Sequence, residues 1–113
     1  MRDMISAVTN KMLNEMVETA IRQAVQLQVK ANKEDAKQRE LRDSNKPYDF
    51  RMKHQMLEGS HAVCEVLWRV YGGYPYQMHK AIEILVDENK SKSLGLDCQD
   101  YIALFEDALK KVS

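Results

Sequence analysis

The sequence predicts an all-α fold, a small bundle of about four helices with a long N-terminal helix able to pair with another copy. The only two prolines, Pro47 and Pro75, fall where the residue pattern changes. The long stretches between these positions are rich in Ala, Leu, Met, Glu, Lys and Gln, which have high helix propensity. A chain of 113 residues can enclose one hydrophobic core, so we expect a single domain over residues 1–113.

The first predicted helix is a long amphipathic helix over residues 1–33, regular from about Met4 to about Lys33. Its apolar positions alternate steps of four and three and form a heptad seam of Leu13, Val17, Ala20, Ala24, Leu27 and Ala31. A helix of about 30 residues is about 45 Å long, which exceeds what a domain of this size covers. We therefore expect the seam to form an oligomer interface, most simply in a homodimer.

Residues 34–46 are predicted to be a charged arm or linker. From Lys30 to Lys46 the chain has six basic and four acidic residues and almost no apolar ones, so this stretch is not expected in the core. Its Ala, Lys, Glu, Gln and Arg content also favours helix. Two alternatives remain: a solvated loop, or an extension of the first helix that breaks near Ser44 and Asn45.

Residues 47–113 are predicted to form a three-helix portion. The first of these helices begins near Pro47, a residue suited to the first helical position, and ends at Gly72 and Gly73. Gly59 inside this helix costs about 1 kcal/mol relative to Ala, which predicts a backbone or a ligand passing close by. The inward stripe of this helix is Met56, Leu57, Ser60, Val63, Cys64, Leu67, Val70 and Tyr71.

The last two helices follow the Gly-Gly-Tyr-Pro-Tyr turn. One runs from the turn to about Lys90, with Ile84 directed away from its apolar face of Met78, Ala81, Ile82, Leu85 and Val86. The other is expected to start at an Asp97 N-cap, with Leu96 and Tyr101 as a hydrophobic staple. Its apolar face is Cys98, Tyr101, Ile102, Phe105, Ala108, Leu109 and Val112.

Charge and cysteine content narrow the class of partner. Seventeen Lys and Arg balance seventeen Asp and Glu, which argues against attachment to nucleic acid or to an anionic membrane through net charge. Cys64 and Cys98 both fall in apolar helical patterns, so we expect reduced core thiols. The N-terminal residues lack a continuous hydrophobic run, and no stretch reaches the length of a membrane span, which predicts a cytoplasmic protein.

Two sets of side chains have the spacing of metal ligands. Glu15 and Glu18 form an E-x-x-E pair, which resembles the pair used by helical nucleotide pyrophosphohydrolases of the MazG family. That family also uses a later E-x-x-D, whereas Glu83 and Asp87 are four residues apart here. The resemblance implies a metal-dependent nucleotide hydrolase, which we retain as an alternative function.

The second set shares one side of the helix that begins near Pro47 and recurs at steps of four, three and four: His54, Glu58, His61 and Glu65. The Glu58 to His61 spacing matches the E-x-x-H of ferritin-like diiron proteins, but those sites need a second E-x-x-H that this chain lacks. Boundary packing with local ion pairs is the preferred interpretation, and we expect no metal and no cofactor. No nucleophile elbow or phosphate-binding glycine loop occurs, so the sequence predicts no catalysis.

Aromatic residues gather around the expected turn after Gly72. The candidate binding residues are Trp68, Arg69, Tyr71, Tyr74, Tyr76 and Lys80, with His79 beside the last of them. Aromatics with Arg are enriched at binding hot spots and can also stack a nucleobase. The alternative interpretation is that these rings close the end of the bundle and pack the turn.

These features together favour association over catalysis. We expect a non-catalytic protein that binds a partner protein stoichiometrically, as an adaptor, inhibitor or regulator of the kind often found in bacteria and their viruses. The first alternative is a helical oligomer that binds a small ligand or a nucleotide at the aromatic turn.

Overall fold

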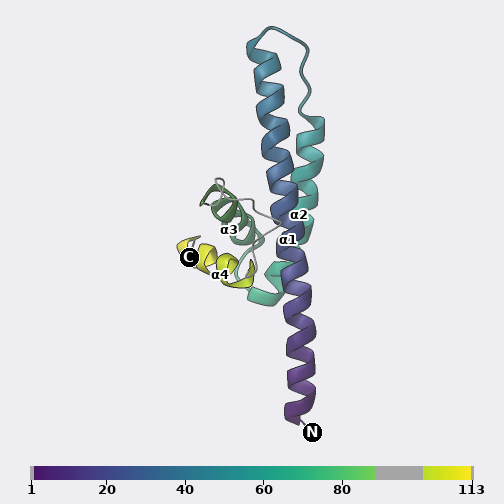
Figure 1. Ribbon diagram of the computed structural model, residues 1–113, viewed down its shortest axis with the longest axis vertical. Coiled ribbons are helices and arrows are strands. Elements are labelled where there is room, and N and C mark those ends of the chain that lie inside the picture. The colour runs from purple at the N-terminus through teal and green to yellow at the C-terminus, as the bar shows by residue number, and fades with distance from the viewer. Residues whose placement is uncertain (1, 89–100, 113) are drawn as a thin grey trace.

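The computed structural model describes residues 2–88 and 101–112, with side chains described over 11–87 and 101–112. Its elements are α1 (Arg2–Asp43), α2 (Arg51–Tyr71), α3 (Pro75–Glu88) and α4 (Tyr101–Val112), with no strand in the described ranges. The predicted all-α class and the four helices are confirmed. The molecule is elongated, with extents of 66 × 25 × 24 Å, because α1 and α2 lie side by side along its long axis (Figure 1).

Helix α1 extends ten residues beyond the end predicted from the sequence, from about residue 33 to Asp43. It ends in a turn in which Asn45 takes a left-handed backbone conformation with φ 58° and the Lys46 amide donates to the Leu41 carbonyl at 2.8 Å. Asn is one of the few non-glycine residues that adopts this conformation readily. The helical alternative for the charged segment is therefore the correct one.

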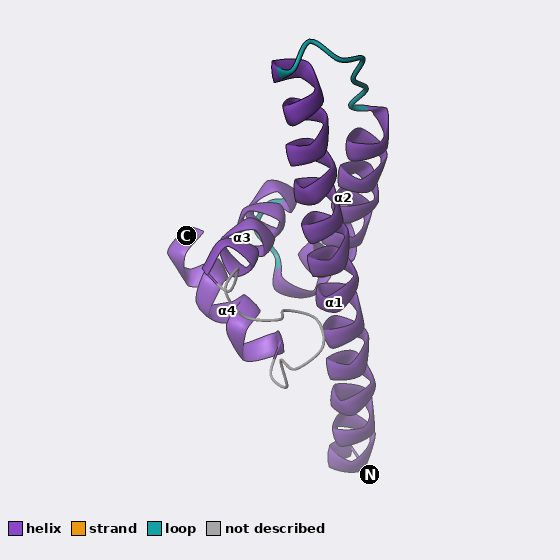
Figure 2. Cartoon of the chain, turned by 45° about the horizontal axis from the view of Figure 1, so that its top comes forward, coloured by secondary structure: helices purple, strands orange, loops and turns teal. Residues whose placement is uncertain are grey.

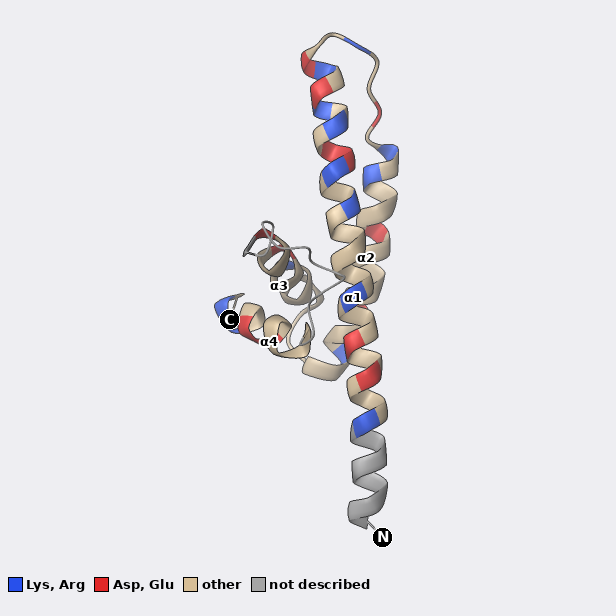
Figure 3. Cartoon of the chain, viewed as in Figure 1, with Lys and Arg blue, Asp and Glu red and all other residues tan. Residues whose placement is uncertain are grey.

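The charged part of α1 packs along the start of α2 instead of standing free in solvent. Asp35 Oδ1 lies 2.8 Å from Lys53 Nζ, and Asp35 Oδ2 lies 2.7 Å from Arg39 Nε. The Gln38 side chain is buried, and its Oε1 accepts the Asp49 amide at 2.8 Å. Figure 3 shows the alternating positive and negative residues along this part of α1. The predicted arm is thus a helix end that packs one face against α2, while most of its side chains stay exposed to solvent.

Helix α2 begins at Arg51, so the predicted start near Pro47 is wrong. Asp49 explains the shift, because its carboxylate accepts the Arg51 amide at 2.9 Å and its own amide is held by Gln38. The segment before Arg51 is therefore fixed in a non-helical conformation by a contact from α1. Such a tertiary contact outweighs the local preference of Pro47 for a first helical position.

The hydrophobic core lies where α3 and α4 pack against the α1–α2 pair (Figure 2). Its largest fully buried side chains include Tyr101 and Phe105 of α4 and Leu67 of α2. Ser60, Cys64 and Leu67 of the predicted α2 stripe are buried, whereas Val70 is 38% exposed near the end of that helix. Ile84, predicted to face away from the core, is instead partly buried against it, because α3 is packed by more than one neighbouring helix.

Gly59 allows α1 and α2 to approach closely. A Cβ atom at this position would lie 3.3 Å from Leu27 Cδ1, tighter than an ordinary van der Waals contact. The predicted close approach is present, but the neighbour is the Leu27 side chain of α1 and not the backbone or ligand that was expected. The predicted Asp97 N-cap, the staple at Leu96 and the core role of Cys98 lie outside the described residues.

Candidate functional site

The turn between α2 and α3 is held by hydrogen bonds from both of its ends. Gly72 and Gly73 each have φ 79°, a conformation that would strain any other residue. Trp68 Nε1 donates to the Gly73 carbonyl at 2.8 Å, and the Tyr74 amide donates to Gln77 Oε1 at 3.0 Å. The turn therefore presents its side chains from a fixed backbone.

Tyr74 and Tyr76 form an exposed aromatic pair on this turn. Their ring centroids lie 6.0 Å apart with an interplanar angle of 23°, and the residues are 64% and 62% exposed. Trp68 is 37% exposed beside them, and Arg69 and Lys80 are exposed. We call Trp68, Arg69, Tyr74 and Tyr76 the aromatic turn.

Tyr71, also predicted as a binding residue, belongs to the bundle. Its hydroxyl donates to Glu106 Oε1 of α4 at 3.1 Å, and its ring centroid lies 5.4 Å from that of Phe105. Burial, together with the Glu106 carboxylate, raises the pKa of Tyr71 to about 12. The predicted set therefore divides into the exposed aromatic turn, the exposed Lys80 on α3, and Tyr71, which closes the end of the bundle.

A pocket of about 260 Å³ lies between α2 and α3, directly beside the aromatic turn. It is lined by His61, Cys64, Glu65, Pro75, Tyr76 and His79. The His61 and His79 rings meet edge to face, with centroids 4.2 Å apart and an interplanar angle of 83°. Residue spacing alone did not predict this pairing, although His61 and His79 lie on helices joined by a short turn, which was a usable signal.

Burial shifts the pKa of two groups in this pocket, His79 and Cys64. His79 Nε2 lies 2.7 Å from Glu83 Oε1, and burial, followed by the nearby His61, holds the pKa of His79 below its ordinary value. Burial raises the pKa of the Cys64 thiol to about 11. At neutral pH the pocket therefore contains a neutral His79 imidazole and a protonated thiol.

The four residues of α2 that have metal-ligand spacing were considered as candidates only, and the structure shows where each of them lies. His54, Glu58, His61 and Glu65 are all exposed, and His61 contacts His79 on α3. Among the described residues, no group of three or more His, Cys, Asp or Glu side chains is placed to hold a metal ion. Glu18 forms an ion pair on its own helix, with its Oε1 2.9 Å from Arg22 Nη2. One carboxylate of the E-x-x-E pair is therefore already paired with a cation.

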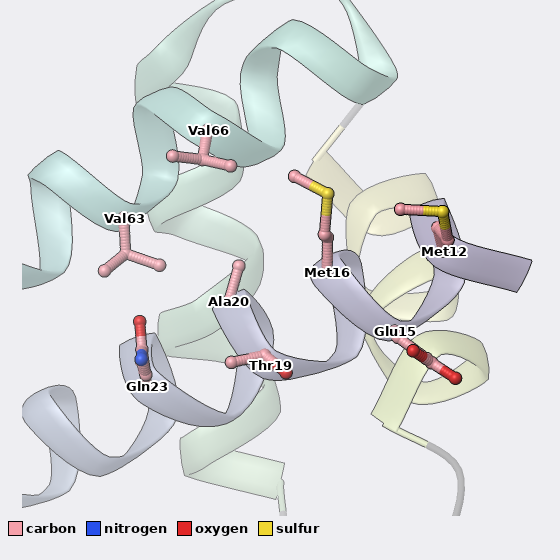
Figure 4. Close-up of a pocket in the computed structure, with 8 residues that line it drawn as sticks. All are labelled: Met12, Glu15, Met16, Thr19, Ala20, Gln23, Val63 and Val66. Carbon is pink, nitrogen blue, oxygen red and sulfur yellow. The ribbon is translucent and has the colours of Figure 1, made fainter. Parts of the chain in front are cut away.

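Glu15 lies at an apolar groove of about 410 Å³ between α1 and α2, shown in Figure 4. The groove is lined by Met12, Glu15, Met16, Thr19, Ala20, Gln23, Val63 and Val66. Met12 and Met16 are 60% and 58% exposed, and Glu15 points away from the two methionine side chains. The groove therefore presents adaptable apolar surface with a carboxylate at one side.

The heptad seam of α1 is covered largely within the chain, which corrects its predicted use as an oligomer interface. Val17, Ala20, Ala24 and Ala31 are buried, and Leu27 is partly buried against Gly59. Leu13, at the N-terminal end of the seam, is 36% exposed. The seam thus binds the chain's own helices, and Leu13 with Met12 and Met16 marks the part of α1 that stays open.

Comparison with known proteins found no match among protein-family models, curated proteins or solved structures. None of the described helices has the length and apolar character needed to cross a membrane. The candidate sites are therefore the aromatic turn, the histidine pocket beside it and the methionine groove, each defined by its own geometry.

Proposed function

We propose that this chain is a non-catalytic binding protein that acts stoichiometrically on a partner protein, as an adaptor, inhibitor or regulator, through the aromatic turn. The observation that carries the proposal is the stacked Tyr74–Tyr76 pair, in which each residue is more than 60% exposed. When a partner covers large exposed aromatic side chains, apolar surface is removed from water, which favours binding. Such side chains are typical of binding hot spots.

The rigidity of the turn supports this proposal. Pro75 separates the two tyrosines, Trp68 is tied to the Gly73 carbonyl, and Gln77 accepts the Tyr74 amide. Groups that are already ordered lose little conformational entropy on binding, so more of the contact energy becomes affinity. Arg69 adds an exposed guanidinium that can pair with a carboxylate of the partner.

The charged end of α1 is less suited to specific binding. Arg39 and Lys53 both form ion pairs with Asp35. Arg42 Nε lies 3.6 Å from Asp43 Oδ1, so these cations already have partners within the chain. Exposed ion pairs typically contribute about 0 to 1 kcal/mol, whereas truncating an aromatic hot spot typically costs about 2 kcal/mol or more. The aromatic turn is therefore the stronger candidate for the contact that decides affinity.

Binding of a small ligand is the second candidate function, and the pocket of about 260 Å³ favours it because this pocket shares Pro75 and Tyr76 with the turn. Its volume is at the small end of ligand sites. Metal-dependent nucleotide hydrolysis has no comparable observation in its favour, because Glu18 is paired with Arg22 and the described carboxylates and histidines do not gather around it.

We also propose that two copies associate through the open N-terminal part of α1. Met12, Leu13 and Met16 expose 60%, 36% and 58% of their surface within two turns of one helix. Covering these side chains removes apolar surface from water, and a second copy offers the same surface in return.

Affinity capture from the native host tests the binding function. The full chain and its Arg69→Ala/Tyr74→Ala variant are used as bait, and a His54→Ala variant serves as an exposed control on α2 outside the turn. We expect one partner protein to be retained by the wild type and the control and lost from the double variant. Equal retention by all three baits would contradict the assignment to the aromatic turn.

A further inference from the structure

Helix α1 extends past the end of the helix that packs along it. Leu27 of α1 lies opposite Gly59 of α2, where a Cβ atom at Gly59 would be 3.3 Å from Leu27 Cδ1. Helix α2 ends twelve residues after Gly59, at Tyr71, and twelve residues back from Leu27 along the antiparallel α1 is residue 15. Residues 2–14 of α1 therefore extend beyond α2, as the purple end of the chain shows in Figure 1. We call residues 2–14 the α1 overhang.

The methionine groove begins at this overhang and continues between α1 and α2. On α1 its lining runs from Met12 to Gln23, and on α2 it consists of Val63 and Val66. Met12 and Met16 are 60% and 58% exposed, and Val66 is 44% exposed. A groove of about 410 Å³ between two packed helices, with apolar walls of this kind, fits the apolar face of a third helix.

The overhang of a second copy has the length that this groove requires. Consider two antiparallel α1 helices in which Lys11 of each lies opposite Glu15 of the other. Residues 3–14 of one copy then lie opposite residues 12–23 of the other, which is the part of α1 that lines the groove. A parallel pair would instead set overhang against overhang and leave both grooves open.

The charges at the rim of the groove fit the same antiparallel pairing. Glu15 lines the groove, and Lys11 is one helical turn before it on the same side of α1. Both are exposed, and neither forms an ion pair with another described residue. In the antiparallel pair, the two-fold axis produces two contacts between opposite charges. A parallel pair would set Lys11 beside Lys11 and Glu15 beside Glu15, which repel each other.

We propose that the methionine groove receives the α1 overhang of a second copy in an antiparallel two-fold pair, with Lys11 of each copy opposite Glu15 of the other. The proposal rests on the proposed association of two copies and states what occupies each groove. Met12 of one copy then lies about 3 Å along the axis from Met12 and from Met16 of the other, so the methionine side chains interlock. The overhang gains from this packing because helices in proteins take most of their stability from tertiary contacts.

Charge reversal tests the pairing in the full-length protein. Lys11→Glu and Glu15→Lys each create two contacts between like charges, and we expect each to weaken the dimer by about tenfold or more in sedimentation equilibrium. Lys11→Glu/Glu15→Lys restores opposite charges across the axis, so its dissociation constant should return to within about threefold of the wild-type value. Lys30→Glu and Glu40→Lys reverse exposed charges of α1 outside the groove, and these controls should leave the dimer unchanged.

A distance between the two copies tests the direction of the helices. Gln26 is exposed on α1 beyond the groove, and a spin label at Gln26→Cys in a Cys98→Ser background leaves only the buried Cys64 as a second thiol. Antiparallel pairing centred on residue 13 places the two labels about 40 Å apart, whereas a parallel pair places them within about 20 Å. The shorter distance, measured by electron paramagnetic resonance, would overturn the proposal.

The outcomes separate this inference from the proposals on which it depends. A wild-type dimer that neither single reversal weakens, or that the double reversal does not restore, would overturn the antiparallel arrangement and leave the association of two copies standing. A wild-type monomer at concentrations of tens of micromolar would overturn both, and the groove would then be open to a helix of another protein. Binding through the aromatic turn is tested separately by Arg69→Ala/Tyr74→Ala, because neither residue lines the groove.

Discussion

Asp35 in the charged part of α1 lies with its Oδ1 2.8 Å from Lys53 Nζ near the start of α2. Both side chains are mostly covered, with exposed fractions of 21% and 24%. The pair joins the C-terminal part of α1 to the N-terminal part of α2. We expect a double-mutant cycle of Asp35→Asn and Lys53→Met to give a coupling free energy of about 0.5–1 kcal/mol in urea unfolding. A coupling of zero would show that this contact does not hold the helices together.

The same pair predicts the acid sensitivity of the protein. The hydrogen bond from Lys53 is the main cause that lowers the pKa of Asp35 below its ordinary value of 3.8. Because the folded pKa is below the unfolded one, the stabilisation is present above 3.8 and is lost as pH falls through the folded pKa. Thermal unfolding of the wild type should therefore lose more stability below this value than Asp35→Asn does. Parallel curves for the two proteins would contradict this.

Cys64 should be unreactive in the folded protein. It is 1% exposed, and burial raises its thiol pKa to about 11. At about pH 8 only about one thiol in a thousand is then a thiolate, the form that attacks disulfide reagents. We expect a Cys98→Ser variant, which leaves Cys64 as the one cysteine, to react with Ellman's reagent only after denaturation. Rapid reaction of the native variant would mean that this part of α2 opens readily.

Substitutions in α1 distinguish its buried seam from its open N-terminal part. Ala24 is fully buried, so Ala24→Glu places an unpaired charge in the core and should destabilise the fold by about 3 kcal/mol or more. Met12→Glu/Met16→Glu changes exposed positions and should alter stability by about 0.5 kcal/mol or less. We expect this second variant to convert a dimer to a monomer in multi-angle light scattering.

The control for self-association is Gln26→Glu, which adds charge at an exposed position of α1 outside the groove. It should keep the mass of the wild type. A wild-type monomer at concentrations of tens of micromolar would contradict the proposed association of two copies.

Helical periodicity predicted most of the buried positions, although not Val70 or Ile84, but it did not predict what covers them. The α2 positions Ser60, Cys64 and Leu67 are buried as predicted, because a single packed helix follows its own 3.6-residue period. Ala24 of the α1 seam was also predicted to be buried, and it is. It is covered by the core of its own chain, whereas the sequence predicted a second copy. The spacing of apolar residues along one helix does not say which other helix packs against that face.

Contacts between distant segments account for the remaining errors. The start of α2 depends on Gln38 accepting the Asp49 amide across eleven residues of sequence, so no local rule for Pro47 could anticipate it. The candidate site shows the same limit. The exposed tyrosines of the turn were identified from composition, whereas the pairing of His61 with His79 depends on how α2 and α3 pack.

The dissociation constant of the captured partner is the most direct test of binding through the aromatic turn. It is measured by calorimetry for the wild type, for Arg69→Ala/Tyr74→Ala, and for a variant in which Gln replaces Lys33, Lys37, Arg39 and Arg42. We predict that the double variant binds at least about tenfold more weakly with unchanged helicity, while the affinity of the charge variant falls about fivefold or less. Normal binding by the double variant, together with loss of binding by the charge variant, would place the function in the charged part of α1 and contradict the account.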